Sequence, residues 1–301
     1  MNVAVTGATG FIGKYLVSDL IDKGCGVIAI GRSYSRLSNI FDDSIRIYES
    51  DYSLESLLEA FQKADIVVHL AARRLTRNSN PYRLSPFFES NILSTENVFL
   101  AAKEHNIEKV CQTSSISVYS EANEAPFKEE VLPRADNIYG ISKLACEHIG
   151  NLFSAKTNVK AINLRLGYLF GLGEKEDLVF MKYISLAKKK LPLQIWGSGD
   201  TRIDYIYVKD VISAIDKAIQ PGAPHGTYNI GSGRSYSVLE IAEEINKVFE
   251  NRGNIEFDDT KQEKGGNIYM DVSKAHELLK WKPHYNMKEA LIDLKKLDDE
   301  N

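Results

Sequence analysis

A tyrosine and a lysine separated by three residues, Tyr139 and Lys143, are the first side chains whose types and spacing could do chemistry. The stretch from about Ile138 to Ser154 predicts an amphipathic helix, on which residues four apart share one face. An ammonium beside a phenol favours the phenolate, which makes the tyrosine a usable acid and base near neutral pH. The pair therefore predicts proton transfer at a substrate oxygen.

The same spacing occurs again at Tyr205 and Lys209. This second pair lies in the alternating run IDYIYV, which predicts a strand, and four residues of strand span about 13 Å. Side chains that far apart cannot share a face, so we expect only the helical pair to be functional.

A cluster of hydroxyls, TSSISVY over Thr113 to Tyr119, follows a predicted strand. Ligands of doubly wound sheets bind at the carboxyl ends of such strands, where Ser115 or Ser117 could donate a hydrogen bond to a substrate oxygen. The alternative is a serine-rich turn whose hydroxyls bond to the backbone. The tyrosine and lysine downstream favour the functional interpretation.

A glycine-rich segment, TGATGFIG from Thr6 to Gly13, stands between the first predicted strand and the first predicted helix. Gly7, Gly10 and Gly13 lack a Cβ, so the backbone can turn tightly and approach a pyrophosphate at the helix N-terminus. The alternative is a simple strand-to-helix turn, but this position in the chain favours a dinucleotide site.

The second predicted strand ends at Gly31 and is followed by Arg32. NAD-binding proteins usually present an acidic residue to the ribose at this point, whereas an arginine can hold the 2′-phosphate of NADP. Arg32 therefore favours NADP over NAD, the alternative being a solvated surface arginine.

These residues need a sheet to position them, and the first half of the chain alternates apolar runs with helix-length stretches. That pattern is typical of a parallel sheet with crossover helices. We predict strands near Asn2–Thr6, Val27–Ile30, Ile45–Glu49, Asp65–Ala71, Lys109–Thr113 and Lys160–Arg165.

The pattern becomes less regular after Arg165. The predicted fold class is α/β, a Rossmann-type doubly wound parallel sheet with a smaller mixed α/β C-terminal lobe. Residues 1–165 would form the NAD(P)-binding domain, which also receives a strand and a helix from about 203–231, and residues 166–301 would mainly bind substrate.

Composition excludes several classes of function. The net charge of −4 lacks the basic character of a nucleic-acid binder, and with a mean hydropathy of −0.25 no apolar run reaches the roughly 20 residues of a membrane span. The three cysteines are widely spaced and no histidine pattern suits a metal. No secretory signal is recognisable, so we expect a cytoplasmic, metal-free protein.

Taken together, the chain resembles an extended short-chain dehydrogenase/reductase of the NAD(P)-dependent nucleotide-sugar epimerase/dehydratase family. The resemblance covers nearly the whole chain and rests on motifs in family order, namely TGATGFIG, HLAA, NILST, SSISVY, YGISK, LRLGYLFG, WGSGDTRIDYIYVKDV, YNIGSG and DVSKAHELLKWKP.

The resemblance implies roles for individual residues. Tyr139 would be the catalytic acid and base, Lys143 would assist it and hold the nicotinamide ribose, and Ser115 would be the catalytic hydroxyl. The remaining cofactor contacts would come from Gly7, Gly10, Phe11, Ile12, Gly13, Arg32, Asp51, Tyr52, Leu70, Ala71, Ala72 and Asn91.

Substrate contacts are expected from Arg74, Ser115, Ser117, Tyr168 and Arg202. Family dehydratases resemble one another in carrying Thr-Asp-Glu at the active loop, where this chain has Ser-Ile-Ser, so elimination of water is disfavoured. Tyr168 replaces a common asparagine and Arg202 is displaced by one position, which changes the expected diphosphate contacts.

The leading hypothesis is a 4-epimerase of a UDP-hexose or UDP-N-acetylhexosamine that works through a transient 4-keto sugar. The alternatives are an NADPH-dependent reductase of a nucleotide-linked 4-keto-deoxysugar and a non-catalytic dinucleotide-binding protein. Helices near Phe87–Glu104 and Ile138–Ser154 correspond to those that pair in the dimers of similar proteins, so a homodimer is expected.

Overall fold

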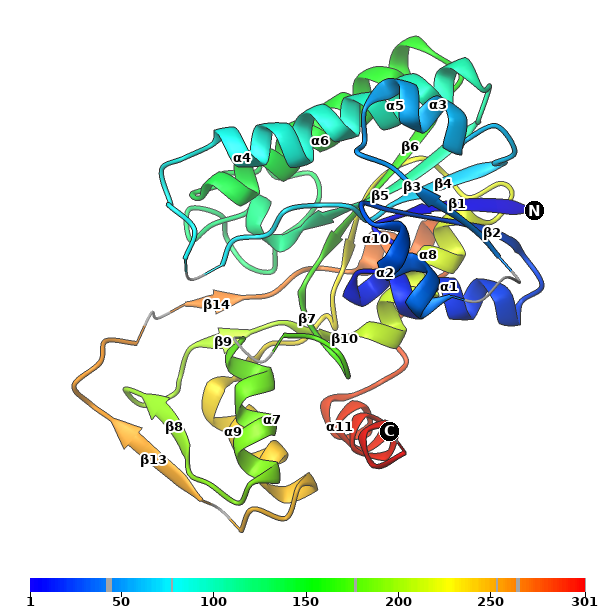
Figure 1. Ribbon diagram of the computed structural model, residues 1–301. Coiled ribbons are helices and arrows are strands. Elements are labelled where there is room, and N and C mark those ends of the chain that lie inside the picture. Colours follow the sequence, from blue (N-terminus) through cyan, green and yellow to red (C-terminus); the bar gives the residue numbers. More distant parts are fainter. Residues whose placement is uncertain (42–44, 77, 176–177, 253, 264–265, 301) are drawn as a thin grey trace.

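A seven-stranded sheet forms the centre of the computed structural model, which describes residues 1–41, 45–76, 78–175, 178–252, 254–263 and 266–300. All its strands are parallel, in the order β11-β6-β5-β4-β1-β2-β3 (Figure 1). They are β1 (Asn2–Thr6), β2 (Gly26–Gly31), β3 (Arg46–Glu49), β4 (Ile66–His69), β5 (Lys109–Ser115), β6 (Lys160–Leu166) and β11 (Gly226–Ile230). The strand order reverses between β1 and β4, which confirms the predicted fold class and marks the point where such sheets bind ligands.

The six predicted strands are all present, and β4 is shorter than expected. It ends at His69 instead of Ala71, because the backbone N–H groups of Leu70 and Ala71 turn toward the Thr6 hydroxyl, at 3.2 and 3.3 Å. The chain thereby leaves the sheet where the glycine loop begins.

Helices cover both faces of the sheet, which explains why its strands are apolar throughout. One face packs against α1 (Phe11–Asp22), α2 (Tyr34–Ile40), α8 (Val208–Ile219) and α10 (Ser273–Leu278), and the other against α3 (Leu54–Ala60), α5 (Ser94–Glu104) and α6 (Ile138–Lys156) (Figure 1). Short helices complete the layer, namely α4 (Ser85–Phe87), the π-helix η1 (Phe88–Leu93) and the 3₁₀ turn η2 (Ile116–Val118). No helix in the described part of the chain combines the length and apolar character needed to cross a bilayer.

A smaller lobe lies below the sheet in Figure 1 and has a core of its own. It contains α7 (Val179–Lys188), α9 (Val238–Val248), α11 (Met287–Asp299) and the parallel pair β8 (Leu193–Trp196) and β13 (Ile255–Asp258). Capping boxes fix the starts of α9 and α11, at Ser237 with Glu240 and at Asn286 with Glu289. β11 and α8 come from beyond residue 166 but join the sheet layer, whereas the assignment of separate cofactor and substrate domains stays a prediction.

Short strands connect the lobe to the sheet. They are β7 (Tyr168–Phe170), β9 (Arg202–Ile203), β10 (Tyr205–Tyr207), β12 (Tyr236–Ser237) and β14 (Asn267–Ile268). The expectation of one continuous strand through IDYIYV is wrong, because Asp204 interrupts it by accepting bonds from Ser232 and Met270. β10 ends at Tyr207, so Lys209 lies in α8, where it pairs with Asp293, while Tyr205 packs on Tyr168.

Candidate functional site

The glycine loop between β1 and α1 lies against the residues that follow β4. Gly7 has a φ of 68°, in the left-handed region that favours glycine, and a Cβ added to it would lie 2.8 Å from the backbone nitrogen of Ala71. A Cβ on Gly13 would lie 2.4 Å from the carbonyl oxygen of Gly7. The fold therefore requires both glycines, and it brings the predicted cofactor segments 6–13 and 70–72 together at a helix N-terminus suited to a phosphate.

Tyr139 and Lys143 lie in the first two turns of α6. Asn137 caps this helix, since its side-chain oxygen accepts a bond from Gly140 N at 2.9 Å. Tyr139 is half-buried and Lys143 is buried, and they lie one turn apart on a common face. Lys143 also lies close enough to the end of β4 to help lower the pKa of His69.

The Ser115 loop, which comprises residues 113–119, lies directly against the start of α6. A Cβ added to Gly140 would lie only 1.9 Å from the carbonyl oxygen of Ser117. Ser117 N donates to the Ser115 hydroxyl oxygen at 3.1 Å, which leaves the Ser115 hydroxyl hydrogen available to a ligand. The structure thus brings the predicted hydroxyl loop and the Tyr139 helix into van der Waals contact.

A buried chain of hydrogen bonds runs beneath these residues and contains a histidine that the sequence analysis did not single out. His69 Nδ1 lies 2.7 Å from the Thr6 hydroxyl, and Nε2 lies 3.2 Å from the Thr95 hydroxyl, which donates to Cys146 of α6. Burial, followed by the charge of Lys143, lowers the pKa of His69 to about 3. The imidazole is therefore neutral and links β1, β4, α5 and α6. A polar residue at the end of an apolar strand was the available signal.

This neutral histidine predicts loss of stability in acid. Its pKa is about 3 in the folded protein against about 6.5 in the unfolded chain. Between those values the unfolded state binds more protons, so the free energy of unfolding should fall as pH falls, by about 2 kcal/mol from pH 7 to pH 5. Urea unfolding of wild type and His69→Asn at both pH values measures this contribution of His69 to the free energy of unfolding.

The variant should lack the His69 contribution. The difference in the free energy of unfolding between wild type and variant should therefore be about 2 kcal/mol smaller at pH 5 than at pH 7. Asp204, whose pKa burial raises to about 6, contributes pH dependence of the opposite sign but is common to both proteins. An equal pH dependence in wild type and variant would contradict the assignment of a neutral buried imidazole.

Asn91 is buried in η1 and bridges the chain after β4 to α6. Its side-chain oxygen accepts from Arg73 N at 2.7 Å, and its amide donates to Arg73 O at 3.1 Å and to the Ser142 hydroxyl at 2.9 Å. These contacts hold the backbone that would line a cofactor, in a π-helical turn of the kind often found at functional sites. A direct contact between Asn91 and a cofactor stays a prediction.

A cavity of about 670 Å³ lies beside the ends of β2 and β3. It is lined by Arg32, Glu49, Ser50, Asp51, Glu89 and Ser90. The Arg32 guanidinium lies 5.5 Å from the centre of the Tyr52 ring, and the Tyr52 hydroxyl accepts a bond from Gly7 N at 3.1 Å. The structure therefore places three predicted cofactor contacts, Arg32, Asp51 and Tyr52, next to one another and next to the glycine loop.

The other predicted cofactor residues lie around the glycine loop. Ile12 and Leu70 pack on the sheet core, Ala72 is exposed, and Phe11 contacts Tyr15 edge to face at 5.8 Å.

Two arginines predicted to bind substrate are paired within the protein. Arg74 makes a bidentate ion pair with the buried Glu174, at 2.7 and 2.9 Å. Arg202 donates to Ser235 O at 2.8 Å and to Glu240 at 3.0 Å. Tyr168 is 41% exposed, so part of this residue remains accessible to a ligand. Substrate binding by these three residues stays a prediction, and for both arginines it would compete with the existing pairs.

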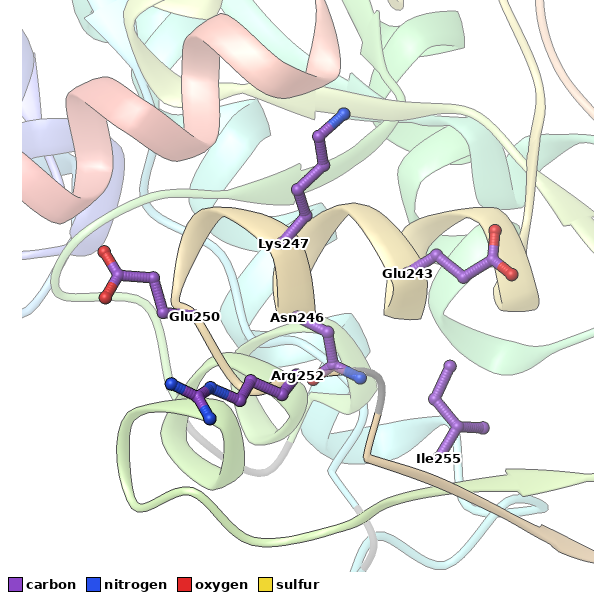
Figure 2. Close-up of a pocket in the computed structure, with 6 residues that line it drawn as sticks. All are labelled: Glu243, Asn246, Lys247, Glu250, Arg252 and Ile255. Carbon is purple, nitrogen blue, oxygen red and sulfur yellow. The ribbon is translucent and has the colours of Figure 1, made fainter.

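A second cavity, of about 520 Å³, lies in the lobe beside α9 (Figure 2). Its lining carries charges of both signs and consists of Glu243, Asn246, Lys247, Glu250, Arg252 and Ile255. None of these is a predicted site residue, so the candidate site remains at the carboxyl edge of the sheet.

A parallel sheet with a glycine loop after β1, a serine at the end of β5 and a Tyr and Lys pair on α6 defines a short-chain dehydrogenase/reductase type of fold and site. Residues 3–231 match the NAD dependent epimerase/dehydratase family, and the chain belongs to that family. The family resemblance found in the sequence is thereby confirmed.

Three known proteins illustrate the likeness. The crystal structure of UDP-N-acetylglucosamine 4-epimerase from Bacillus cereus superposes with a TM-score of 0.88 and 34% identity, covering 99% of this chain and 96% of that one. UDP-glucuronic acid 4-epimerase from Bacillus cereus, solved with UDP-glucuronic acid and NAD, gives 0.86 and 26%, covering 99% and 100%. The dTDP-4-dehydro-6-deoxyglucose reductase of Escherichia coli is 26% identical over 93% of this chain and 92% of its own.

Proposed function

We propose that the protein is a nucleotide-sugar 4-epimerase acting on a UDP-hexose or UDP-N-acetylhexosamine with a nicotinamide dinucleotide. The observation that carries this proposal is the contact between the Ser115 loop and the Tyr139 helix at Gly140. This contact supports a site in which a hydroxyl donor and an acid-base pair lie close together at the carboxyl edge of the sheet, where ligands of such folds bind. The Cβ-free cradle formed by Gly7 and Gly13 suits a dinucleotide pyrophosphate there.

The glycine loop with Gly7 and Gly13 would hold the nicotinamide dinucleotide, which would supply reversible hydride exchange with C4 of the sugar, on one face and then on the other. Tyr139 accepts the proton of the C4 hydroxyl during oxidation and gives it back during reduction, so the net reaction changes only stereochemistry. Lys143 supplies positive charge on the same helix face, and the Ser115 hydroxyl donates to the C4 oxygen. Between the two half-reactions the sugar is a 4-keto intermediate, and it rotates so that its opposite face receives the hydride.

The loop composition supports epimerisation over dehydration. Elimination of water needs an acid and a base beside the sugar, and residues 115–117 offer two hydroxyls and an isoleucine that is 4% exposed. A reductase would use the same Ser115, Tyr139 and Lys143. Because the Escherichia coli relative is a dTDP-4-dehydro-6-deoxyglucose reductase, reduction of a 4-keto sugar is the second candidate function.

Proton NMR of the purified protein with UDP-N-acetylglucosamine and, separately, UDP-glucose tests the proposal. We expect each active substrate to convert to its C4 epimer until an equilibrium mixture forms, with no net change in absorbance at 340 nm. Absence of epimerisation with both sugars would contradict the proposal. Stoichiometric loss of NADPH with a dTDP-4-keto-6-deoxysugar would identify the reductase instead.

Bound cofactor released from the protein by acid distinguishes NAD from NADP by mass. Arg32 by itself favours NADP, but it shares its cavity with the carboxylates of Glu49, Asp51 and Glu89. A 2′-phosphate would bring further negative charge next to these groups, so repulsion favours NAD. Recovery of NADP would show that the attraction of Arg32 outweighs the three carboxylates.

Apolar side chains on the outer surface support a homodimer. Phe88 and Leu93 of η1 and Ile141 and Leu152 of α6 are 50%, 40%, 45% and 57% exposed. A second copy that docks its α5 and α6 on this surface would remove them from water. Light scattering at micromolar concentration should give about twice the mass of one chain, and a monomer would contradict the assignment.

A further inference from the structure

Both ends of the Ser115 loop are tied to one buried ion pair. Glu147 lies on α6 one turn after Lys143, Arg165 lies on β6, and their side chains are 3% and 5% exposed. Arg165 donates from Nε to Glu147 Oε1 at 2.9 Å and from Nη2 to Oε2 at 2.7 Å. The pair is thus bidentate, which fixes the direction of the guanidinium as well as its distance.

The loop meets this pair on each side of Ser115. The Ser114 hydroxyl donates to Glu147 Oε1 at 2.5 Å, directly before Ser115 in the chain. At the other end of η2, Arg165 Nη1 donates to the Tyr119 hydroxyl at 2.6 Å. The four residues between these anchors include Ser115 and also Ser117, whose carbonyl oxygen contacts the start of α6.

The second anchor continues into the segments beyond the sheet. The Tyr119 hydroxyl also bonds Asn229 Oδ1 of β11 at 3.0 Å, and Asn229 Nδ2 donates to Phe127 O and Asp271 O at 2.9 and 3.1 Å. The Tyr119 ring stacks on Phe127 at 4.8 Å. The loop is therefore held against the neighbouring segments by side-chain contacts at one defined end.

A buried ion pair is an inefficient way to gain stability, because desolvation of both charges offsets much of their attraction. Its value lies in geometry, since it accepts partners only in set directions. Here those partners are Ser114 and Tyr119, which anchor the two ends of the loop. Glu147 itself lies on α6, the helix that carries Tyr139.

We infer that Glu147 and Arg165 form a positioning clamp that sets the Ser115 hydroxyl at a fixed place relative to Tyr139. The inference rests on the proposed function, because it concerns the alignment of two groups that act on one sugar oxygen. Ser114 and Tyr119 are positioning residues in this scheme, acting through Ser115.

Removing either anchor tests the clamp. Tyr119→Phe keeps the stacked ring and removes the hydroxyl, and Ser114→Ala removes the other anchor while Arg165 still satisfies Glu147. Each variant should lower kcat for the UDP-sugar about 10-fold, because small displacements of reacting groups are costly, and should change KM less than about 2-fold. Tyr228→Phe is the matched control, since this buried neighbour of Asn229 loses only a bond to Pro224 O.

A double-mutant comparison separates positioning from a general structural effect. Combined with Ser115→Ala, the anchor variants should lower kcat less than about 2-fold further, because the group that they position is already gone. A full 10-fold further loss, or equal kcat in wild type, Ser114→Ala and Tyr119→Phe, would overturn the inference alone. A wild type inactive on both UDP-sugars would instead contradict the proposed function, and the inference with it.

Discussion

Replacing Tyr139 by phenylalanine should lower kcat for the UDP-sugar by about 10³-fold while the protein keeps its bound dinucleotide. The ring remains at the start of α6, but no group is left to take the proton of the sugar hydroxyl, and such transfer contributes roughly 10²–10⁴ to a rate. Epimerisation followed by NMR gives kcat, and the absorbance of the bound cofactor gives its occupancy.

Tyr183→Phe is a suitable control for this experiment, because it also removes a tyrosine hydroxyl, bonded to Gln194 O at 2.7 Å in the lobe. Its kcat should equal that of wild type. An undiminished kcat in Tyr139→Phe would show that Tyr139 is not the acid-base group and would assign the Tyr139 and Lys143 spacing to chance. The non-catalytic dinucleotide-binding alternative would be favoured if wild type itself showed bound dinucleotide but no turnover.

Replacing Gly140 by alanine should have the second large effect. Alanine is more favourable than glycine inside a helix by about 1 kcal/mol, so a purely local view predicts a more stable protein. The added Cβ would instead lie 1.9 Å from the carbonyl oxygen of Ser117, and this backbone atom cannot move without shifting the Ser115 loop. We expect kcat to fall at least about 100-fold, because a displacement near 1 Å misaligns the reacting groups.

His148→Ala, at an exposed position of the same helix, is the control for helix propensity and should leave kcat unchanged. Circular dichroism and urea unfolding distinguish a folded but misaligned Gly140→Ala variant from an unfolded one. A fully active Gly140→Ala protein would show that the loop and the helix need not touch for catalysis.

Much of the fold follows from local patterns in the chain. The apolar runs predicted six of the seven sheet strands, because strands covered on both faces by helices carry few polar residues. The glycine segment could also be placed at the first turn, because a predicted strand precedes it and a predicted helix follows it. β11 was expected only as a contribution from about 203–231, because its pairing with β6 spans more than 60 residues.

Interactions between distant segments were less predictable. Nothing in the spacing of Arg74 shows that it pairs with Glu174, 100 residues later. The continuous strand expected through IDYIYV was wrong because Asp204 bonds to residues from two other segments. Such contacts depend on which loops the strand order places side by side, and a one-dimensional pattern does not contain that order.

The sequence by itself determined the family and the sheet, and it predicted the Ser115, Tyr139 and Lys143 set, because each depends on short motifs and spacings along a strand or a helix. Only the tertiary structure decided how these residues are held. It buries His69, which keeps its imidazole neutral, and it brings Gly140 into contact with Ser117. It also bonds the Glu147–Arg165 pair to both ends of the Ser115 loop. The physical reason is that burial and side-chain contact arise only when segments that are distant in the sequence pack against one another in the folded protein.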